Sequence, residues 1–344
     1  PDGVRGRYVR LTATKLRDFE GQVCLALSQI EVVSGGENVA AGAAVTASDS
    51  LEEGPWSAAA VTDGIGVPGT NPRANDTILL RRDLEVRPGL RRALVHVSGL
   101  GHYEMTVNGR RVDQGLMTPG WTAYDRVALY DTHDLTAQLR PGSNAVGLLL
   151  GNTMYNVQAG RYLKFISPFR PLMAIAQIRL EYEDGSVETI GTDGDWRVAS
   201  GPIVFSNVFG GEDYDARREP AGWDGPGFDD SSWTPAVARN GSLPTLRGAS
   251  HASPPFRSYE TLAPVQVREL DPGVSVYDFG QNASMMPRLR VRGPAGARVK
   301  MIPAELLNED GSVNRWSSGR GDAWWSYTLA GQDGGEEYFP RFYY

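Results

Sequence analysis

The sequence predicts an all-β chain made of tandem β-sandwiches. Its 344 residues include 41 glycines and 22 prolines, which divide it into short segments. Between these turns, apolar and polar residues alternate over short runs, which is the period of a half-buried strand rather than of a helix. Hydrophobic residues make up 41% of the chain, so it can bury proper cores, and its length exceeds that of one ordinary sandwich. We therefore expect two or three β domains.

The composition also limits the partners. The net charge is −7 and the 34 lysines and arginines are spread along the chain, so we expect no nucleic-acid partner, which would need a concentrated basic face. The sequence contains no run of 18 apolar residues, so we predict no membrane span. The single cysteine, Cys24, cannot form an internal disulfide. It is interpreted as a small buried hydrophobe rather than a catalytic group, because no histidine lies near it in sequence and a core cysteine is common. These features fit a cytoplasmic or an exported protein equally.

Residues 1–72 predict a partial sandwich. Apolar and polar residues alternate on both sides of a charged turn in residues 8–33, which indicates two strands. Residues 38–64 add a short strand and a Gly-Pro-Trp loop. These pieces resemble a discoidin-like sandwich of the galactose-binding type. Trp56 in the loop is expected to contact a sugar or, as is commoner after Gly-Pro, to cap a core.

Residues 73–247 predict a second sandwich, which follows a linker at residues 68–74. Its clearest strand is NAVGLLLG, residues 144–151, which is apolar on both faces and is therefore expected in the middle of a sheet. The preceding Pro-Gly pair is expected to turn the chain into this strand.

Two dipeptides predict hairpin turns within this sandwich. Asn108-Gly109 lies between alternating runs and is the best hairpin signal in the chain, because both central residues of a type I′ turn need positive φ. Asp184-Gly185 ends another alternating run and predicts a second turn.

The stretch from Gly210 to Ala236 combines acidic, basic and aromatic residues. It has neither a helical period nor strict alternation, so it is predicted to be a loop. Carboxylates accept hydrogen bonds from sugar hydroxyls and aromatic rings lie against a pyranose, so the loop is predicted to bind carbohydrate. Its candidate residues are Glu212, Asp213, Tyr214, Asp215 and Arg217. The alternative is that Asp215 and Arg217 tie the loop to its own sandwich, with Trp223 and Trp233 in the core.

Residues 248–344 predict a third sandwich, with a Pro/Ser-rich linker at residues 244–260. The alternation on either side of Pro-Ala-Gly at residues 294–296 predicts a hairpin closed there. Asp278 and Glu305 are interpreted as structural partners of nearby arginines such as Arg288, rather than as catalytic groups.

Six motifs follow one another along the chain: YEMTVNG, PGWTAYD, DLTAQLRPGSNAVG, GEDYDAR, PGFDDSSW and YDFGQN. Their residues and order resemble the N-terminal β region of bacterial α-L-rhamnosidases of glycoside hydrolase family 78. The resemblance implies jelly-roll or galactose-binding-like sandwiches. It makes residues 73–247 a carbohydrate-binding-like domain and residues 248–344 the sandwich that precedes the catalytic domain.

The resemblance also implies a reaction. Such enzymes hydrolyse terminal α-L-rhamnose with inversion, using one carboxylic acid to protonate the leaving oxygen and one carboxylate to activate water. These groups belong to an (α/α)6 barrel that would follow Tyr344, so no catalytic residue is expected in this chain and no cofactor is required. The expected partners are a rhamnose-containing glycan or glycoside and the barrel of the same protein.

A calcium ion near the sugar is a further implication of the resemblance. Calcium takes six to eight oxygen ligands, and suitable atoms occur on Asp125, Asn152, Asn156, Glu212 and Asp213. No single-loop calcium motif joins these residues. Asn152 and Tyr155, in the GN-x-x-Y turn, are added to the predicted carbohydrate contacts. Thr153 and Met154 replace the usual Gly-Trp of the family, which removes a ring that would stack on sugar.

Three functions follow from these observations. The leading hypothesis is the non-catalytic β region of an α-L-rhamnosidase, which predicts exposed apolar surface in the C-terminal part, where a barrel would dock. The second is a free-standing carbohydrate-binding module, which predicts sugar affinity without that surface. The third is an all-β hydrolase with a carboxylate pair of its own among Glu212, Asp213 and Asp215. Its carboxylates would project from one segment, whereas a glycosidase pair usually comes from opposite walls of a cleft.

Overall fold

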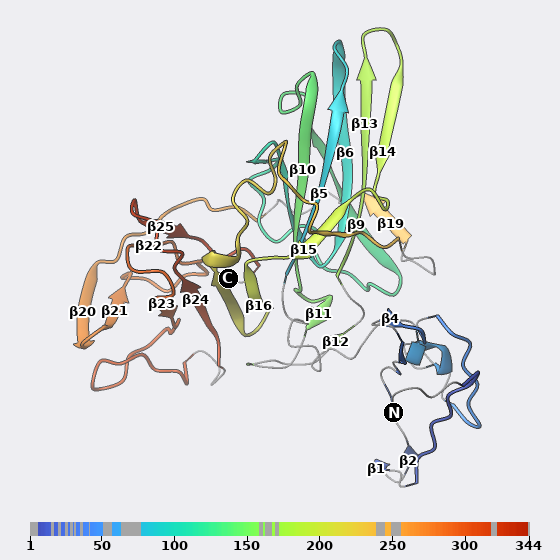
Figure 1. Cartoon of the computed structure of the whole chain (residues 1–344). Coiled ribbons are helices and arrows are strands. Elements are labelled where there is room, and N and C mark those ends of the chain that lie inside the picture. The colour runs from blue at the N-terminus through green and yellow to red at the C-terminus, as the bar shows by residue number, and fades with distance from the viewer. Residues whose placement is uncertain are drawn as a thin grey trace. The chain divides into compact units, whose positions relative to one another are not determined.

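The computed structural model describes residues 77–157, 172–238, 256–317 and 322–342 continuously, and shorter pieces between residues 6 and 248. The chain forms two compact units, Pro1–Asn71 and Pro72–Tyr344. Regular structure in the described residues is almost entirely strand, and its helical elements are the short 3-10 turns η1 (Ala58–Thr62) and η2 (Ala216–Arg218) (Figure 1). The all-β prediction is confirmed. Across the described part of the chain, no helix is long and apolar enough to cross a membrane.

The first unit holds two small antiparallel pairs. Strand β1 (Arg17–Phe19) pairs with β2 (Gln22–Cys24), and β3 (Val33–Ser34) pairs with β4 (Glu37–Asn38). Among the described residues of the range 8–33, where strands are predicted, strand structure begins at residue 17. Trp56 and the side chain of Cys24 lie outside the described residues.

The second unit contains a sandwich of two sheets. One sheet has the order β18-β15-β5-β10-β7-β8 and the other has the order β14-β13-β6-β9-β19. Apolar side chains from both sheets, including the fully buried Leu148, Ile178 and Trp196, form the core between them. The bounds of the first sheet are Thr234–Pro235, Arg197–Ser200, Ile78–Val86, Gly142–Gly151, His102–Val107 and Arg110–Arg111, and those of the second are Val187–Gly191, Met173–Tyr182, Leu90–Leu100, Val127–Asp134 and Thr245–Gly248.

Local signals in this sandwich are confirmed. Asn108 and Gly109 both adopt positive φ, 53° and 75°, and join β7 to β8. Strand β10, which contains NAVGLLLG, lies between β5 and β7 and is buried over almost its whole length. The turn at Asp184-Gly185 joins β13 to β14, with Gly185 at φ 81°.

A second group of strands begins at β16 (Ile203–Asn207). A four-stranded sheet has the order β16-β17-β24-β23, with β17 at Gly211–Asp215, β24 at Trp324–Thr328 and β23 at Arg298–Met301. Its core includes Trp223, and the partly buried Trp233 packs against it, which agrees with the alternative interpretation of these two tryptophans. This sheet draws strands from both sides of the predicted 247/248 domain boundary, which stays a prediction. The described residues of this unit also form three two-stranded pairs: β11 (Asn156–Val157) with β12 (Ser167–Pro168), β20 (Gln266–Asp271) with β21 (Val274–Asp278), and β22 (Leu289–Val291) with β25 (Glu336–Tyr338).

The hairpin predicted around residues 294–296 is wrong. Strand β22 pairs with β25, and β23 pairs with β24, so the two runs have different partners. The same pairing decides the partner of Arg288. This residue contacts Glu337 on β25 at 2.7 Å, and not Asp278 or Glu305. Asp278 instead accepts a hydrogen bond from the backbone N–H of Gly280 at 2.7 Å.

The stretch from Gly210 to Ala236 is a loop only in part, which corrects the prediction. Its first residues form β17, which pairs with β16 on one side and runs parallel to β24 on the other. The pairing with β24 joins residues more than 100 positions apart, and no local pattern signals it. The loop character is found beyond η2, where the chain is irregular up to β18.

Candidate functional site at strand β17

Strand β17 divides the predicted site residues between two faces. Successive side chains of a strand point to opposite sides, so Glu212 and Tyr214 share one face while Asp213 and Asp215 share the other. Glu212 is fully buried and Tyr214 is 7% exposed, whereas Asp213 and Asp215 are partly exposed. The five neighbouring polar residues of the sequence therefore do not converge on one site.

Glu212 is held by groups from the C-terminal end of the chain. Its Oε1 accepts a hydrogen bond from the Tyr338 hydroxyl at 2.9 Å, and its Oε2 accepts from the backbone N–H groups of Arg341 and Phe342, each at 3.1 Å. Burial raises the pKa of Glu212 to about 7, although each of these donors opposes that shift by favouring the charged form. The carboxyl thus has several internal partners and no exposed surface.

Tyr214 belongs to a cluster of tyrosines beneath β17. Its ring stacks on Tyr327 and lies tilted against Tyr338, with ring centroids 5.6 Å apart in both pairs. Its hydroxyl donates to Glu219 Oε2 at 2.5 Å. Burial, followed by the nearby Glu219 charge, raises the pKa of Tyr214 far above its ordinary value. The ring faces are therefore used in packing.

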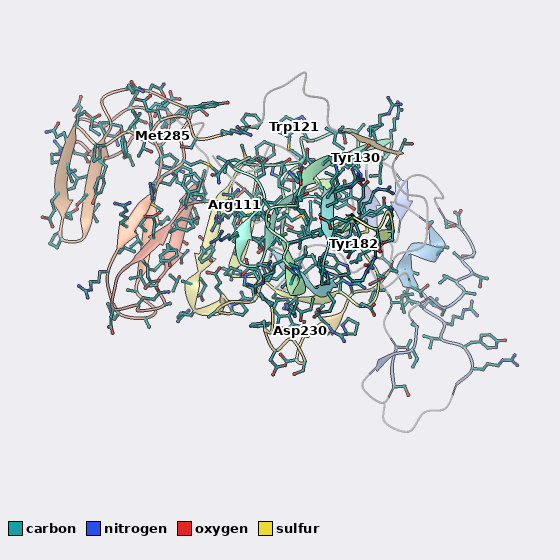
Figure 2. The ribbon with its side chains drawn as sticks, turned by 90° about the horizontal axis from the view of Figure 1, so that it is seen from above. Arg111, Trp121, Tyr130, Tyr182, Asp230 and Met285 are labelled. Atoms are coloured by element: carbon teal, nitrogen blue, oxygen red, sulfur yellow. The ribbon has the colours of Figure 1, made fainter. Side chains whose placement is uncertain are left out.

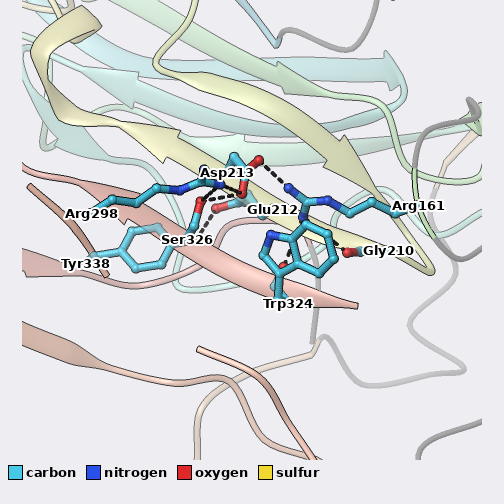
Figure 3. A network of polar contacts seen from close by, with 8 residues as sticks. All are labelled: Arg161, Gly210, Glu212, Asp213, Arg298, Trp324, Ser326 and Tyr338. Carbon is cyan, nitrogen blue, oxygen red and sulfur yellow. Dashed lines mark hydrogen bonds and ion pairs between the residues drawn. The ribbon is translucent and has the colours of Figure 1, made fainter. Parts of the chain in front are cut away.

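Asp213 is the centre of a polar network on the opposite face (Figure 3). It accepts hydrogen bonds from Arg161 and from the Ser326 hydroxyl, and Arg298 Nη2 approaches its Oδ1 at 3.2 Å. Figure 3 shows the two arginines reaching the carboxylate from opposite sides. Two cations and a hydroxyl therefore neutralise and orient this carboxylate.

Arg161 connects this network to the aromatic residues. Its guanidinium carbon lies 3.8 Å from the ring centroid of Trp324 and 4.1 Å from that of Phe205. It also donates to the backbone carbonyls of Gly210 and Trp324, at 3.3 and 3.2 Å. Burial lowers the pKa of Arg161, an effect that Asp213 opposes. Sequence reasoning missed Arg161, Trp324, Arg298, Ser326 and Tyr338, because they lie at least 50 residues from β17 and carry no motif that links them to it.

Asp215 and Arg217 form a bidentate pair. Arg217 Nε and Nη2 donate to the two carboxylate oxygens of Asp215 at 2.8 and 2.7 Å. This pairing lowers the pKa of Asp215, most of all through the side-chain hydrogen bonds from Arg217. The Arg217 side chain is 51% exposed. The alternative interpretation from the sequence, in which these two residues brace their own segment, therefore agrees with the contacts.

Asn152 and Tyr155 lie in a buried turn after β10. Asn152 Nδ2 donates to the Ser206 carbonyl at 3.1 Å, and its side-chain oxygen accepts from Asn156 Nδ2 at 2.8 Å. Tyr155 is 2% exposed and packs edge-on against Tyr124, with 5.2 Å between ring centroids. Both residues are thus internal to the fold. Their assignment to carbohydrate binding stays a prediction.

The oxygens considered for calcium are spread over the fold. Asn152 and Asn156 lie together, but Glu212 and Asp213 lie on opposite faces of β17 and Asp125 faces solvent beside Arg126. In the described ranges, no group of three acidic, histidine or cysteine side chains could hold a metal ion. The calcium ion implied by the resemblance stays a prediction.

The polar residues of β17 therefore serve to hold neighbouring segments in place rather than to catalyse a reaction. A general acid and a general base need access to the same substrate atom from two sides. Glu212 is enclosed, Asp213 is bound by two arginines and Asp215 is chelated by Arg217. These three carboxylates do not form a cleft.

Two family models match the chain. Residues 89–260 match the alpha-L-rhamnosidase N-terminal domain, and residues 268–344 match the bacterial alpha-L-rhamnosidase concanavalin-like domain.

Curated relatives share this region. An alpha-L-rhamnosidase of Streptomyces avermitilis is 41% identical over 251 residues, which cover 73% of this chain and 24% of the relative. An alpha-L-rhamnosidase of Formosa agariphila is 31% identical over 279 residues, which cover 77% of this chain and 28% of the relative. The chain thus spans about a quarter of the length of these relatives.

Solved structures give the same picture. The crystal structure of Streptomyces avermitilis alpha-L-rhamnosidase complexed with L-rhamnose matches with a TM-score of 0.73 and 36% identity, over 85% of this chain and 29% of that one. The alpha-L-rhamnosidase structure from Dictyoglumus thermophilum matches with a TM-score of 0.69 and 35% identity, over 78% of this chain and 29% of that one.

Proposed function

This chain belongs to the bacterial α-L-rhamnosidase family, and we propose that it is the non-catalytic β region of an enzyme that removes terminal α-L-rhamnose from glycosides or polysaccharides. In this proposal the chain supports an (α/α)6 catalytic domain of the same protein. That domain supplies both the acid and the base of an inverting hydrolysis, and water enters between them.

The observation that carries the proposal is a set of exposed large apolar side chains in the C-terminal part of the second unit. Soluble proteins rarely leave large contiguous apolar surface uncovered, and such surface usually marks an interface. Hairpin β20–β21, the residue just before it and the segments that follow it expose eight large apolar side chains, each at least 40% accessible: Val265, Val267, Val274, Tyr277, Ile302, Leu306, Leu307 and Trp316. In Figure 2 this part of the chain, near Met285, carries side chains that stand away from the crowded region around Arg111 and Tyr130. A catalytic domain packed here would cover them.

The carboxylates of β17 argue against the all-β hydrolase. Glu212, Asp213 and Asp215 each have charged or hydrogen-bonding partners inside the fold, so none is positioned to act on a substrate. A catalytic pair on β17 would require these contacts to open.

Seven residues are predicted from the sequence to bind carbohydrate, and we propose that only one part of this set is accessible to a sugar. Of the seven, Arg217 has the only side chain that is half exposed among the described residues, and it lies against Asp215. A sugar bound by this set would therefore be held at the Asp215–Arg217 pair. Calcium, if it takes part, would bind with the sugar rather than in a preformed acidic cluster.

A release assay on p-nitrophenyl α-L-rhamnoside tests the proposal. We expect no turnover by these 344 residues and turnover by a protein that continues them with a catalytic domain, with the inverted anomer as first product in proton NMR spectra. Turnover by the 344 residues alone that disappears on Glu212→Gln would move catalysis to β17. Sugar affinity without turnover in either protein would support the carbohydrate-binding module instead.

A further inference from the structure

Strands β5 and β10 contribute side chains to two hydrophobic cores. Leu80 and Leu148 belong to the core between the two sheets of the sandwich. Their neighbours Leu79 and Leu149 point the other way and belong to the core of the four-stranded sheet. Antiparallel sheets commonly leave one face to water, so a sheet that is covered on both faces indicates a third layer in the same body.

Two glycines of β10 make room for this third layer. Gly147 and Gly151 alternate with Leu149, so they lie on the face that meets the core of the four-stranded sheet. A Cβ added at Gly151 would lie 2.1 Å from the ring of Phe342, which is only 2% exposed. A Cβ added at Gly147 would lie 2.8 Å from the ring of Trp223. The Phe342 ring therefore occupies a notch in β10 that a glycine leaves open.

Polar groups attach residues 338–342 on both sides of this notch. On one side, Glu212 of β17 accepts hydrogen bonds from the Tyr338 hydroxyl and from two backbone N–H groups of this segment. On the other side, Arg341 Nη1 donates to Glu104 Oε2 of β7 at 3.1 Å. The segment thus connects the four-stranded sheet to two strands of the sandwich.

These contacts cross the domain boundary predicted at residues 247/248. Gly151 and Phe342 lie on opposite sides of it, as do Glu104 and Arg341. Independent domains are normally joined by a linker that few contacts cross. A ring in a notch, an ion pair and three hydrogen bonds to one carboxyl are the contacts expected within a single body.

We propose that residues 338–342 are a clasp that couples the sandwich to the four-stranded sheet, so that the two parts open together. This inference goes beyond the proposed function, because it concerns coupling within these 344 residues, which rhamnoside turnover does not test. One consequence does rest on the proposed function: a catalytic domain that continues the chain would be held close to the sandwich by the same contacts.

Hydrogen exchange of the whole chain at increasing urea concentration, followed by mass spectrometry, tests the clasp. The amides of β13 report on the sandwich, and those of β24 report on the four-stranded sheet. Segments that open in one cooperative step lose their protection together. In the parent chain we therefore expect β13 and β24 to lose protection at the same urea concentration.

Gly151→Ala should displace the clasp, because the added Cβ and the Phe342 ring cannot share the notch. We expect β24 to open at a lower urea concentration than β13, and its amides to exchange roughly 100-fold faster than in the parent. Phe342→Ala should have the same effect. Adding Gly151→Ala to Phe342→Ala should then change the exchange rates less than about threefold, because the ring is already gone.

Gly191→Ala is the matched control. It adds the same methyl group to a strand glycine, on β14, where the nearest atom would lie 4.0 Å from the new Cβ. It should keep the single transition of the parent.

Three outcomes would overturn the proposal. Separate transitions of β13 and β24 in the parent would mean that the two parts open independently, and this measurement decides even if a variant fails to fold. A single transition in Gly151→Ala, shifted or not, would place the coupling in the shared sheet rather than in the clasp. Equal effects of Gly151→Ala with and without the Phe342 ring would mean that the substitution damages β10 itself.

Discussion

The Tyr338 hydroxyl donates a hydrogen bond to Glu212 Oε1 at 2.9 Å, across 126 residues of sequence. This hydrogen bond connects β25, which contains Tyr338, to β17, which contains Glu212. With the two backbone N–H groups of Arg341 and Phe342, it makes Glu212 the point at which the end of the chain is attached to the four-stranded sheet.

Glu212→Gln should destabilise the fold. The charged carboxylate of Glu212 only accepts hydrogen bonds, and the amide of glutamine would direct an N–H group at one of three donors. Leaving a buried donor unpaired costs about 1–3 kcal/mol, so the free energy of unfolding by urea should fall by that amount. Glu85→Gln, at an exposed position of β5, is the control and should change it by less than about 0.5 kcal/mol. Equal stability of the two variants would contradict the bracing role.

The same carboxyl predicts a pH dependence. Its pKa is about 7 in the fold, against 4.5 in the unfolded chain. Between these values the folded state holds a proton that the unfolded state has lost, so the contribution of Glu212 is largest below pH 4.5 and declines as the pH rises through 7. The decline is at most about 3 kcal/mol. The free energy of unfolding by urea, measured for the parent and for Glu212→Gln from pH 4.5 to 8, isolates the contribution of Glu212. Subtracting one curve from the other removes the effect of the other titrating groups. A constant difference would refute the shifted pKa.

Arg161→Ala should cost more than the loss of a surface arginine. The side chain is 6% exposed and joins Asp213, two backbone carbonyls and the Trp324 ring. Removing one partner of a buried ion pair costs about 3–5 kcal/mol, and we expect the thermal midpoint to fall accordingly. Arg179→Ala removes an exposed pair with Glu181 and should cost less than about 1 kcal/mol. A double-mutant cycle with Asp213→Ala should return a clear coupling energy. Additive effects would mean that the pair contributes little.

Gly211→Ala should disrupt the parallel pairing of β17 with β24. Gly211 has φ 103°, and an added Cβ would lie 1.9 Å from the Trp324 carbonyl oxygen, which belongs to backbone and cannot turn away. We expect more than about 2 kcal/mol of destabilisation in chemical unfolding. Gly222→Ala is the matched control, since φ is also positive, 70°, but no atom lies within 4 Å. If both variants lose the same stability, the strain arises from φ alone and not from the approach of β24.

The exposed hairpin β20–β21 should make the 344 residues associate when no partner covers it. Val267 and Tyr277 face each other in register and are 53% and 59% exposed. Val267→Lys with Tyr277→Lys should reduce the binding of a hydrophobic dye and shift sedimentation toward monomer, with little change in unfolding free energy. Glu269→Lys, on the same hairpin, tests whether charge alone has this effect. A parent chain that is monomeric and binds no dye would weaken the proposed docking surface.

Local signals in the sequence were sufficient for much of the fold. The positive φ of a type I′ turn restricts Asn108-Gly109 to a few residue types, and both faces of a central strand must be apolar, as in NAVGLLLG. These requirements concern only a few consecutive residues, so the turn and the strand can be predicted from the sequence without knowing which strand pairs with which. The family resemblance rested on motifs of the same local kind.

Strand pairing and the contacts of β17 were decided by the tertiary structure. The sequence indicated which residues around Glu212 could carry chemistry, but alternation along β17 sends them to opposite faces and assigns each a distant partner. Arg161 meets the Trp324 carbonyl across 163 residues, and β22 leaves its neighbour β23 to pair with β25. A backbone N–H donates to any acceptor of suitable geometry and a carboxylate accepts from any such donor, so the local sequence does not specify which partner the fold supplies. The sequence by itself thus determined the strands, turns and family, and only the tertiary structure determined which polar groups pair with one another.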